Sequence, residues 1–256
     1  MNHFETFKQL HQNSTPLLLG NIWDVNSARI FETNGYRAIG ISSQALSNSL
    51  GYDDGENLPF EALLQLTKRV TEVVHIPFSV DMEGGYSRTI AGIIENINKL
   101  HDAGAVGINL EDTIPGPARH LQPTGQFGKT LSAIADHISR NNLQIFLNVR
   151  TDGFLLGMPT ALTETLARTS VYESAGADGI FVPCITKSSD IQEVVKATKL
   201  PVNVMCMPDL PDFDELASLG VKRISMGPFL YNKSNQLIGH LAKKIADDKN
   251  FSSILS

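Results

Sequence analysis

The sequence is poor in cysteine and tryptophan, with two Cys and one Trp among 256 residues. The cysteines, Cys184 and Cys206, form no Cys-x-x-Cys pair and lie in apolar segments, which argues against a disulfide framework. The seven histidines contain no His-x-His or His-Glu-x-x-His pattern, so that a zinc site is not indicated either.

An excess of positive charge and long apolar runs are also missing. Lys and Arg number 21 against 27 Asp and Glu, and the net charge of −6 argues against a nucleic-acid or anionic-membrane partner. Nowhere do 18 apolar residues follow one another, and the first 16 residues lack the apolar stretch of a signal peptide. We therefore expect a cytoplasmic protein.

A repeated pattern, Gly-x-x-x-Ile-x-apolar, begins at four glycines: Gly35, Gly104, Gly176 and Gly220. Each glycine follows a helix-like stretch, where the left-handed residue that ends a helix is most easily glycine. The alternating apolar residues after it predict a strand. Four further strand-like segments lie between these repeats, at residues 16–23, 77–82, 144–151 and 201–207.

Segments with helical periodicity separate the strands, at residues 63–74, 93–100, 160–175 and 211–219. Strand and helix alternating eight times without a break in composition predict one domain over residues 1–256, an α/β fold of the (β/α)₈ TIM-barrel class with a parallel eight-stranded barrel. An open doubly wound sheet is the alternative, but no Gly-x-Gly-x-x-Gly follows any strand. Residues 125–130 lack P-loop spacing and are interpreted as a turn before a helix.

Acidic residues follow several predicted strands, at the end of the barrel where catalytic residues gather in this fold. Asp81 and Glu83 follow the third strand and Glu111 the fourth. Converging carboxylates repel one another unless a cation lies among them, and oxygen ligands favour Mg²⁺, with Mn²⁺ as the alternative. Asp112 and Asp152 either cap the following helices or support the site. Arg150 either neutralises these acids or binds a substrate carboxylate.

Five segments resemble, in order, the signatures of the isocitrate lyase and phosphoenolpyruvate mutase superfamily, its phosphonomutase-like and carboxyvinyl-carboxyphosphonate phosphorylmutase-like members among them. They are Asn21-Ile-Trp-Asp24, Val80-Asp-Met-Glu-Gly-Gly-Tyr86, Gly107-Ile-Asn-Leu-Glu-Asp112, Asn148-Val-Arg-Thr-Asp152 and Gly176-Ala-Asp-Gly-Ile-Phe-Val-Pro183. The resemblance runs from about residue 14 to residue 232.

The resemblance implies a role for each matching residue. Asp81 would bind the metal directly, and Glu83 and Glu111 largely through water. Arg150 would face the substrate carboxylate, and Asp54 would lie near the reacting centre. The residues implied to lie around the substrate are Ser42, Ser43, Gln44, Asn203 and, as an alternative to plain core packing, Trp23.

The resemblance also bears on assembly. The C-terminal segment, about 234–256, has an apolar helical stripe that packs either on its own barrel or on a neighbouring subunit. Because the last helices of relatives often reach a neighbour, a homodimer or homotetramer is expected.

One departure from the superfamily concerns the loop after the fourth strand. The isocitrate-type lyases carry a Lys-Arg-Cys-Gly-His loop there, and the mutases a Lys-Thr-Asn gate, whereas residues 113–121 contain neither. Arg119 and His120 are candidates to replace those groups, or the loop is a solvent-facing lid.

The sequence thus predicts a Mg²⁺-dependent lyase that acts on a small 2-oxo acid, or on a 2-hydroxy di- or tricarboxylate, through pyruvate enolate. The candidates are oxaloacetate decarboxylase-like and phosphonopyruvate hydrolase-like activities, which break C–C and P–C bonds, and retro-aldol or retro-Claisen cleavage of a substituted malate. A phosphoenolpyruvate mutase is the alternative enzyme, and a catalytically silent sensor that binds the metal and the 2-oxo acid is the alternative from another class.

Overall fold

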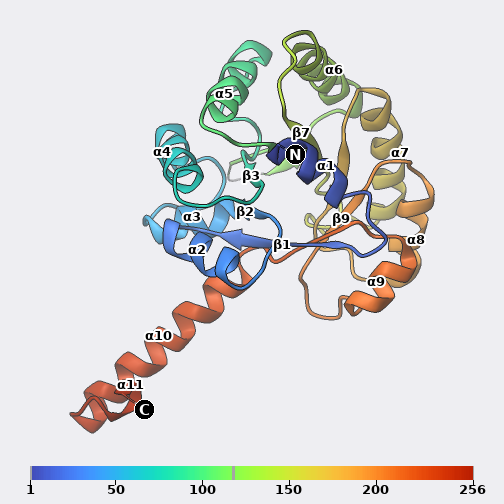
Figure 1. Ribbon diagram of the computed structural model, residues 1–256. Coiled ribbons are helices and arrows are strands. Elements are labelled where there is room, and N and C mark those ends of the chain that lie inside the picture. The colour runs from blue at the N-terminus through green and yellow to red at the C-terminus, as the bar shows by residue number, and fades with distance from the viewer. Residues whose placement is uncertain (1, 117–118, 256) are drawn as a thin grey trace.

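Eight parallel strands close into a barrel in the computed structural model, which describes residues 2–116 and 119–255 (Figure 1). Around the barrel the order is β1-β10-β9-β8-β7-β4-β3-β2, with β2 pairing again with β1. The strands are β1 (Leu17–Ile22), β2 (Ile39–Ile41), β3 (Phe78–Asp81), β4 (Gly107–Glu111), β7 (Phe146–Arg150), β8 (Gly179–Val182), β9 (Val202–Met205) and β10 (Arg223–Ser225). The TIM-barrel prediction is confirmed, and each strand falls within a segment in which the sequence predicted one.

The repeated glycines act as expected from their place in the sequence. Gly104, Gly176 and Gly220 have φ values of 94°, 95° and 92°, in the left-handed region that residues with a Cβ avoid. Each therefore ends a helix and turns the chain into the next strand.

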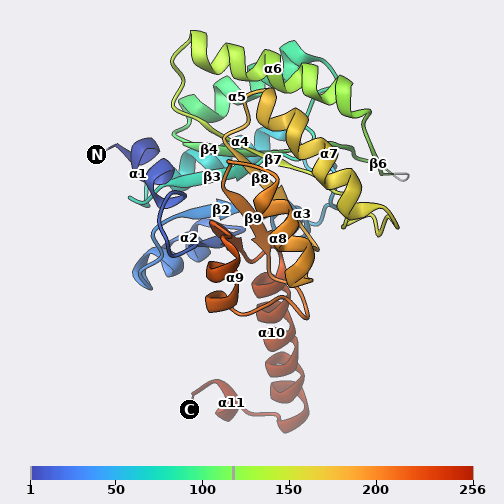
Figure 2. The ribbon, with the colours of Figure 1, turned by 90° about the vertical axis from the view of Figure 1, so that its right-hand side faces the viewer.

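Helices surround the barrel, so that the outward faces of the strands are buried (Figures 1 and 2). The helices are α1 (His3–Leu10), α2 (Val25–Thr33), α3 (Ser43–Ser49), α4 (Phe60–Thr71), α5 (Ile90–Asp102), α6 (Thr124–Arg140), α7 (Ala161–Ser174), α8 (Ser188–Lys196), α9 (Phe213–Leu219), α10 (Phe229–Asp248) and α11 (Ser252–Leu255), of which α10 and α11 project away from the barrel (Figure 1). One prediction was wrong: residues 125–130 are not a turn but the first turns of α6. Gly128 in these turns packs closely against α7: a Cβ on it would lie 2.7 Å from a side-chain carbon of Val171, which is too close, so that only glycine fits.

After β4 the chain forms a small antiparallel hairpin, β5 (Thr113–Ile114) with β6 (His120–Leu121). This hairpin follows the carboxyl end of a barrel strand directly. Residues 117–118, within the loop that the sequence analysis places at 113–121, lie outside the described residues, as do residues 1 and 256.

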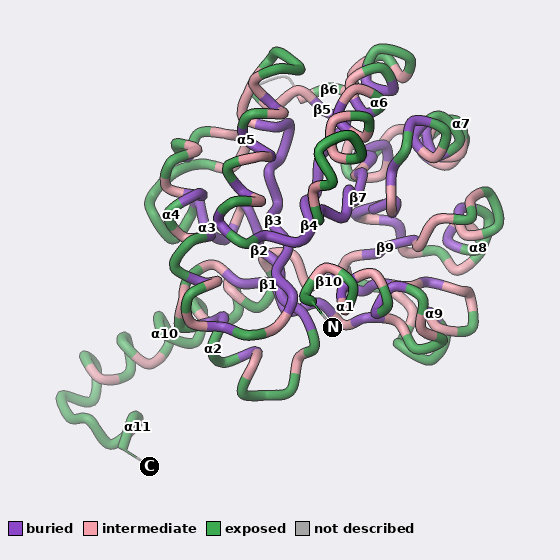
Figure 3. Tube along the Cα trace, turned by 45° about the horizontal axis from the view of Figure 1, so that its top comes forward, coloured by how far each residue is buried: buried purple, intermediate pink, exposed green. Residues whose placement is uncertain are grey.

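The helix α10 runs away from the barrel rather than along it (Figure 2). None of its residues is buried, and Leu237 and Ile238 are 57% and 62% exposed (Figure 3). This chain's own barrel therefore does not cover its apolar stripe. Across residues 2–116 and 119–255, no helix combines the length and apolar character needed to span a membrane.

Candidate active site

A cavity of about 100 Å³ lies at the carboxyl ends of the barrel strands. It brings together residues from β1, β3, β4, β7, β8, β9 and β10 and from the segments that follow the strands, including residues 42–44 after β2. Seven residues that the sequence singled out line it: Ser42, Ser43, Gln44, Asp54, Asp81, Arg119 and Arg150. The other lining residues are Asn21, Asn109, Leu155, Phe181, Pro183, Met205, Ser225, Gly227 and Pro228.

Asp81 ends β3 and is held by two neighbours. The Ser43 hydroxyl donates to its Oδ2 over 3.1 Å, and the Glu83 N–H donates to its Oδ1 over 3.3 Å. Ser42 caps α3, its hydroxyl accepting from the Ala45 N–H, so that Ser43 and Gln44 form the first turn of that helix at the cavity. The main-chain N–H groups of a first turn have no partner within their own helix and are free to bind an oxygen atom.

Asp54 faces Asp81 from the loop between α3 and α4. Its Oδ1 is buried and has no hydrogen-bond partner within the described part of the chain. Burial raises the pKa of the Asp54 carboxyl, and the charge of Asp81 raises it further. A buried carboxylate oxygen without a donor is costly, which indicates that it binds a cation, a proton or a water molecule in the working protein.

Glu83 does not line the cavity; it lies behind Asp81 in the left-handed region, with φ of 49°. Its Oε2 accepts from the Glu56 N–H over 2.9 Å and its Oε1 from the Tyr86 hydroxyl over 3.1 Å. Burial, followed by the charges of Asp54 and Asp81, raises the pKa of Glu83 to about 8. The carboxyl is therefore mostly protonated at neutral pH in the metal-free chain.

Glu111, which is fully buried at the end of β4, is paired with two arginines. Arg119 donates to its Oε1, and Arg150 lies 3.2 Å from its Oε2. Burial outweighs both guanidinium charges and raises the pKa of Glu111. Asp152 lies beside it and accepts from Arg150 Nε over 2.6 Å, while Arg119 lies 3.3 Å from its Oδ2. When Glu111 and Asp152 are ionised, these four charges cancel.

The structure places the two candidate residues of the loop after β4, Arg119 and His120, differently. Arg119 reaches the cavity from the β5–β6 hairpin, where its Nε also donates to Thr113 Oγ1 over 3.2 Å. His120 is exposed, lies in β6 opposite Ile114, and does not line the cavity.

Two predicted substrate residues lie away from the cavity. Asn203 is one step deeper in the barrel, where its Nδ2 donates to the main-chain oxygens of Val204 and Arg223. Met205, two residues later on β9, lines the cavity in its place. Trp23 packs edge-on against Tyr231 of α10, with ring centroids 5.3 Å apart.

The residues that sequence reasoning missed belong to two groups. Asn109, Phe181, Met205 and Ser225 point into the barrel and line the cavity from strand positions, where alternation along each strand was the available signal. Glu56 and Tyr86 hold Glu83, but a loop residue such as Glu56 carries no pattern that reveals its partner.

The donor set fits Mg²⁺ rather than a metal held by several side chains. Among the described residues, no three His, Cys, Asp or Glu side chains are arranged to hold a metal ion together. Mg²⁺ keeps several waters and often takes one or two carboxylates from the protein. Asp81, with the unpartnered Oδ1 of Asp54 facing the same cavity, meets that requirement, whereas both oxygens of Glu83 already have protein donors.

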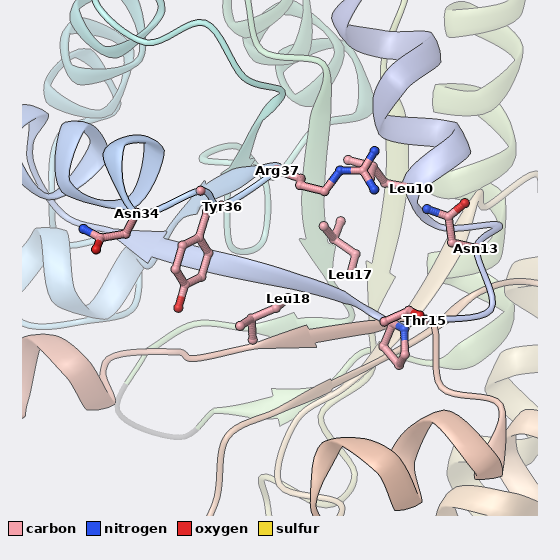
Figure 4. A pocket seen from close by; sticks show the side chains of 10 residues that line it. Leu10, Asn13, Thr15, Leu17, Leu18, Asn34, Tyr36 and Arg37 are labelled. Atoms are coloured by element: carbon pink, nitrogen blue, oxygen red, sulfur yellow. The ribbon is translucent and has the colours of Figure 1, made fainter.

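A second cavity, of about 320 Å³, lies at the opposite end of the barrel beside the start of β1 (Figure 4). Leu10, Asn13, Leu17, Tyr36 and Arg37 are among the residues that line it, and none of its lining residues is acidic. It has no means of holding a divalent cation, and it contains no residue that the sequence predicted for the site.

Fold and cavity together define a (β/α)₈-barrel protein with a polar, acid-rich site at the carboxyl ends of its strands. The family model for phosphoenolpyruvate phosphomutase matches residues 7–246. The chain belongs to this family, within the isocitrate lyase and phosphoenolpyruvate mutase superfamily.

Similar proteins match this chain over most of its length. An uncharacterized protein of Mycobacterium tuberculosis is 32% identical, the match covering 94% of this chain and 89% of the relative. An oxaloacetate decarboxylase of Paraburkholderia xenovorans is 28% identical, with 86% and 74% covered. The crystal structure of a presumed phosphonomutase from Burkholderia cenocepacia is 34% identical and superposes with a TM-score of 0.89, covering 94% of this chain and 99% of that one.

Proposed function

We propose that the protein is a Mg²⁺-dependent lyase that acts on a small 2-oxo acid and forms pyruvate enolate. The observation that carries the proposal is the pair of acids, Asp54 and Asp81, facing Arg119 and Arg150 across one small cavity. The similarity to oxaloacetate decarboxylases favours cleavage of a C–C bond.

The charges around the cavity support a divalent cation. Arg119 and Arg150 balance Glu111 and Asp152 when both acids are ionised, and the raised pKa of Glu83 keeps that carboxyl mostly protonated near neutral pH. Two carboxylates, Asp54 and Asp81, are then left facing the cavity. Two negative charges in a buried site are the complement of one divalent cation.

The chain's own residues supply the other requirements of enolate chemistry. Arg150 and the N–H groups of Ser43 and Gln44 are placed to hold the carboxylate and the 2-oxo group of the substrate. The metal, when bound, supplies Lewis acidity to the 2-oxo group. In decarboxylation of a 2-oxo diacid, the C3–C4 bond breaks, CO₂ leaves, and its electron pair stays in the enolate. C3 then takes up one proton from solvent; Asp54, which is ionised in the resting site and has a raised pKa, is suited to take up that proton and pass it on.

A phosphoenolpyruvate mutase is the second candidate, favoured by the family model and by the Burkholderia cenocepacia relative. Both reactions pass through a pyruvate-like enolate and differ in the group that receives the other fragment. A sensor that binds the same ligands without turnover is the third. The hairpin favours an enzyme, because it brings Arg119 into the cavity.

We also propose that the protein is a homodimer or homotetramer in the cytoplasm, with α10 covering a neighbouring barrel. An apolar groove of about 810 Å³ runs along the barrel beside β1, β10 and α9. Leu18 and Ile224, which are paired across β1 and β10, lie in its floor. No described residue of α10 lines this groove, so α10 does not cover it within its own chain. The exposed apolar stripe of α10 from a second copy is the complementary surface.

The first test is thermal unfolding with oxalate, a flat mimic of pyruvate enolate, in the presence and absence of Mg²⁺. A ligand at 100 times its Kd stabilises the folded state by ~2.7 kcal/mol, which raises Tm by roughly 5–10 °C in a domain of this size. We expect this rise only with both components present, its loss in Asp81→Ala, and its retention in the exposed control Asp53→Ala. The absence of any shift would refute the site.

Turnover then separates the candidates. Oxaloacetate, phosphonopyruvate and phosphoenolpyruvate are each incubated with protein and Mg²⁺, with pyruvate measured by coupled reduction and phosphorus species by ³¹P NMR. Pyruvate formation identifies a lyase or a hydrolase, and interconversion of the two phosphorus compounds identifies a mutase. Binding of oxalate without turnover of any of the three supports the sensor.

A further inference from the structure

Arg223 is a buried cation in the barrel interior that none of the roles above uses. It begins β10, is 1% exposed, and points into the barrel one layer below Ser225, which lines the cavity. The barrel interior around it contains amide and hydroxyl side chains from β4, β7, β9 and β10 itself, where branched apolar side chains usually fill a barrel. These polar neighbours are Asn109, Asn148, Asn203 and Ser225.

No carboxylate forms an ion pair with Arg223 among the residues that the structure describes. Its Nε and Nη1 are buried without a hydrogen-bond partner there, and its guanidinium lies 5.9 Å from the ring centre of Phe7. Arg168, also buried, is by contrast paired with Asp112 and Glu164. Burying an unpaired guanidinium is costly, and an apolar side chain of similar length would fill the space without that cost. Packing alone therefore does not account for Arg223.

The contact that Arg223 does make leads to the cavity. Its Nη2 donates to Asn109 Oδ1 over 3.4 Å, and Asn148 Nδ2 donates to the same oxygen over 2.9 Å. Because a guanidinium can only donate, the atom of Asn109 that faces it must be the oxygen. The NH₂ group of Asn109 is thereby turned toward the cavity that this residue lines, opposite Asp81 on the neighbouring strand.

We propose that Arg223 is a positioning residue whose charge and contact with Asn109 make the cavity select a metal–anion pair over the metal alone. Its unbalanced positive charge opposes a cation bound alone and favours the anionic substrate that follows, while Asn109 presents a donor to that anion. This inference rests on the proposed function, since it concerns the same metal and 2-oxo acid. Burial lowers the pKa of Arg223 to about 9 and the charge of Asp81 raises it, so that the guanidinium stays charged at neutral pH.

The test uses Mg²⁺ and oxalate as separate probes, because loss of one positive charge acts on them in opposite directions. Isothermal titration gives the Kd of Mg²⁺ for metal-free protein and the Kd of oxalate at saturating Mg²⁺. We expect Arg223→Met to bind Mg²⁺ more tightly and oxalate more weakly, each on the order of tenfold. Arg223→Lys, which keeps the charge, is expected to leave the Mg²⁺ affinity within about twofold of wild type, a change small beside that tenfold effect.

A merely structural role would move both affinities in the same direction or leave both unchanged, and either result would overturn the proposal. Should Arg223→Met fail to fold, Arg223→Gln tests the loss of charge in its place, and Asn109→Ala tests the donor separately. Asn109→Ala keeps the guanidinium and removes the donor, so that oxalate binding should weaken while Mg²⁺ binding is unchanged. Wild-type protein that binds neither probe would instead refute the proposed function.

Discussion

Glu56 and Glu83 are joined across the mouth of the barrel: the main-chain N–H of Glu56 donates a 2.9 Å hydrogen bond to the Oε2 of Glu83. The Glu56 carboxylate binds the same segment in return, accepting from the Tyr86 N–H over 2.8 Å and from Arg88 over 2.6 Å. The loop that carries Asp54 is thus fastened to the end of β3, where Asp81 lies. Two acids of the cavity depend for their spacing on a residue that does not line it.

Replacing Glu56 should therefore loosen this loop and destabilise the fold. Glu56→Ala leaves the half-buried Tyr86 N–H without an acceptor, which costs about 1–3 kcal/mol and lowers Tm by roughly 2–10 °C. Arg88→Ala removes only the ion pair that Arg88 forms with Glu56. Because the Arg88 side chain is 54% exposed, its loss should lower the free energy of unfolding by less than about 1 kcal/mol. Differential scanning calorimetry of the two variants measures the contrast. Equal losses would show that the contact with Tyr86 contributes nothing.

The raised pKa of Glu83 predicts how stability changes with pH. An acid with a higher pKa in the folded state holds its proton more tightly there than when unfolded. Glu83 therefore contributes to the free energy of unfolding at low pH. This contribution is lost as pH rises from its pKa of 4.5 in the unfolded chain to its pKa of about 8 in the folded chain. The metal-free protein should lose free energy of unfolding over this range.

Urea titrations of metal-free protein at intervals between pH 5 and pH 8 measure this slope. Glu83→Gln, which cannot ionise, should remove the share of the slope that Glu83 contributes and leave the share of Glu111 and Asp54, whose pKa values are also raised, and it should be the more stable protein at pH 8. Glu5→Gln, an exposed acid in α1, is the matched control and should leave the slope unchanged. A slope of the same size in Glu83→Gln would show that Glu83 is ionised in the folded metal-free chain.

Arg119 and His120 are neighbours in the sequence, but of the two only Arg119 lines the cavity. Arg119→Ala should reduce turnover by at least ~100-fold, because it removes a cation that touches Glu111, Asp152 and the cavity. Binding of oxalate with Mg²⁺ should change much less, since Arg150 still holds the carboxylate. His120→Ala should keep most of the activity. Steady-state kinetics on the accepted substrate decide this, and the reverse ranking of the two variants would reassign the loop.

The strands could be predicted because each is encoded locally, by a helix-ending glycine such as Gly176 and the alternating apolar residues after it. The convergence of Asp81 and Arg150 followed from the fold, which brings all carboxyl ends of the strands to one rim. The sequence did not predict how deep in the barrel a given strand residue lies. Asn203 was expected at the rim and lies one layer below it, because a sequence pattern leaves strand ends uncertain by two residues or more.

Glu56 and Arg223 show a different limit. Glu56 binds Tyr86, 30 positions further along the chain, and no periodicity connects a loop residue to such a partner. Arg223 interrupts an apolar strand pattern, yet its neighbours Asn109 and Asn148 come from strands on the other side of the barrel interior. Their meeting depends on the closed sheet, and the sequence gives no local sign of it.

The apolar stripe of α10 should hold two subunits together. Ile238→Asp places a charge where a second barrel is expected to pack; with two equivalent contacts per dimer, the loss is at least ~3 kcal/mol, or about a hundredfold in Kd. Light scattering after gel filtration should show an oligomer for wild type and a monomer for Ile238→Asp at micromolar concentration. Gln236→Glu, which also adds a negative charge but on the opposite face of α10, is the control and should stay assembled. A wild-type monomer would refute the proposed packing of α10 in the groove beside Leu18 and Ile224 of a second copy.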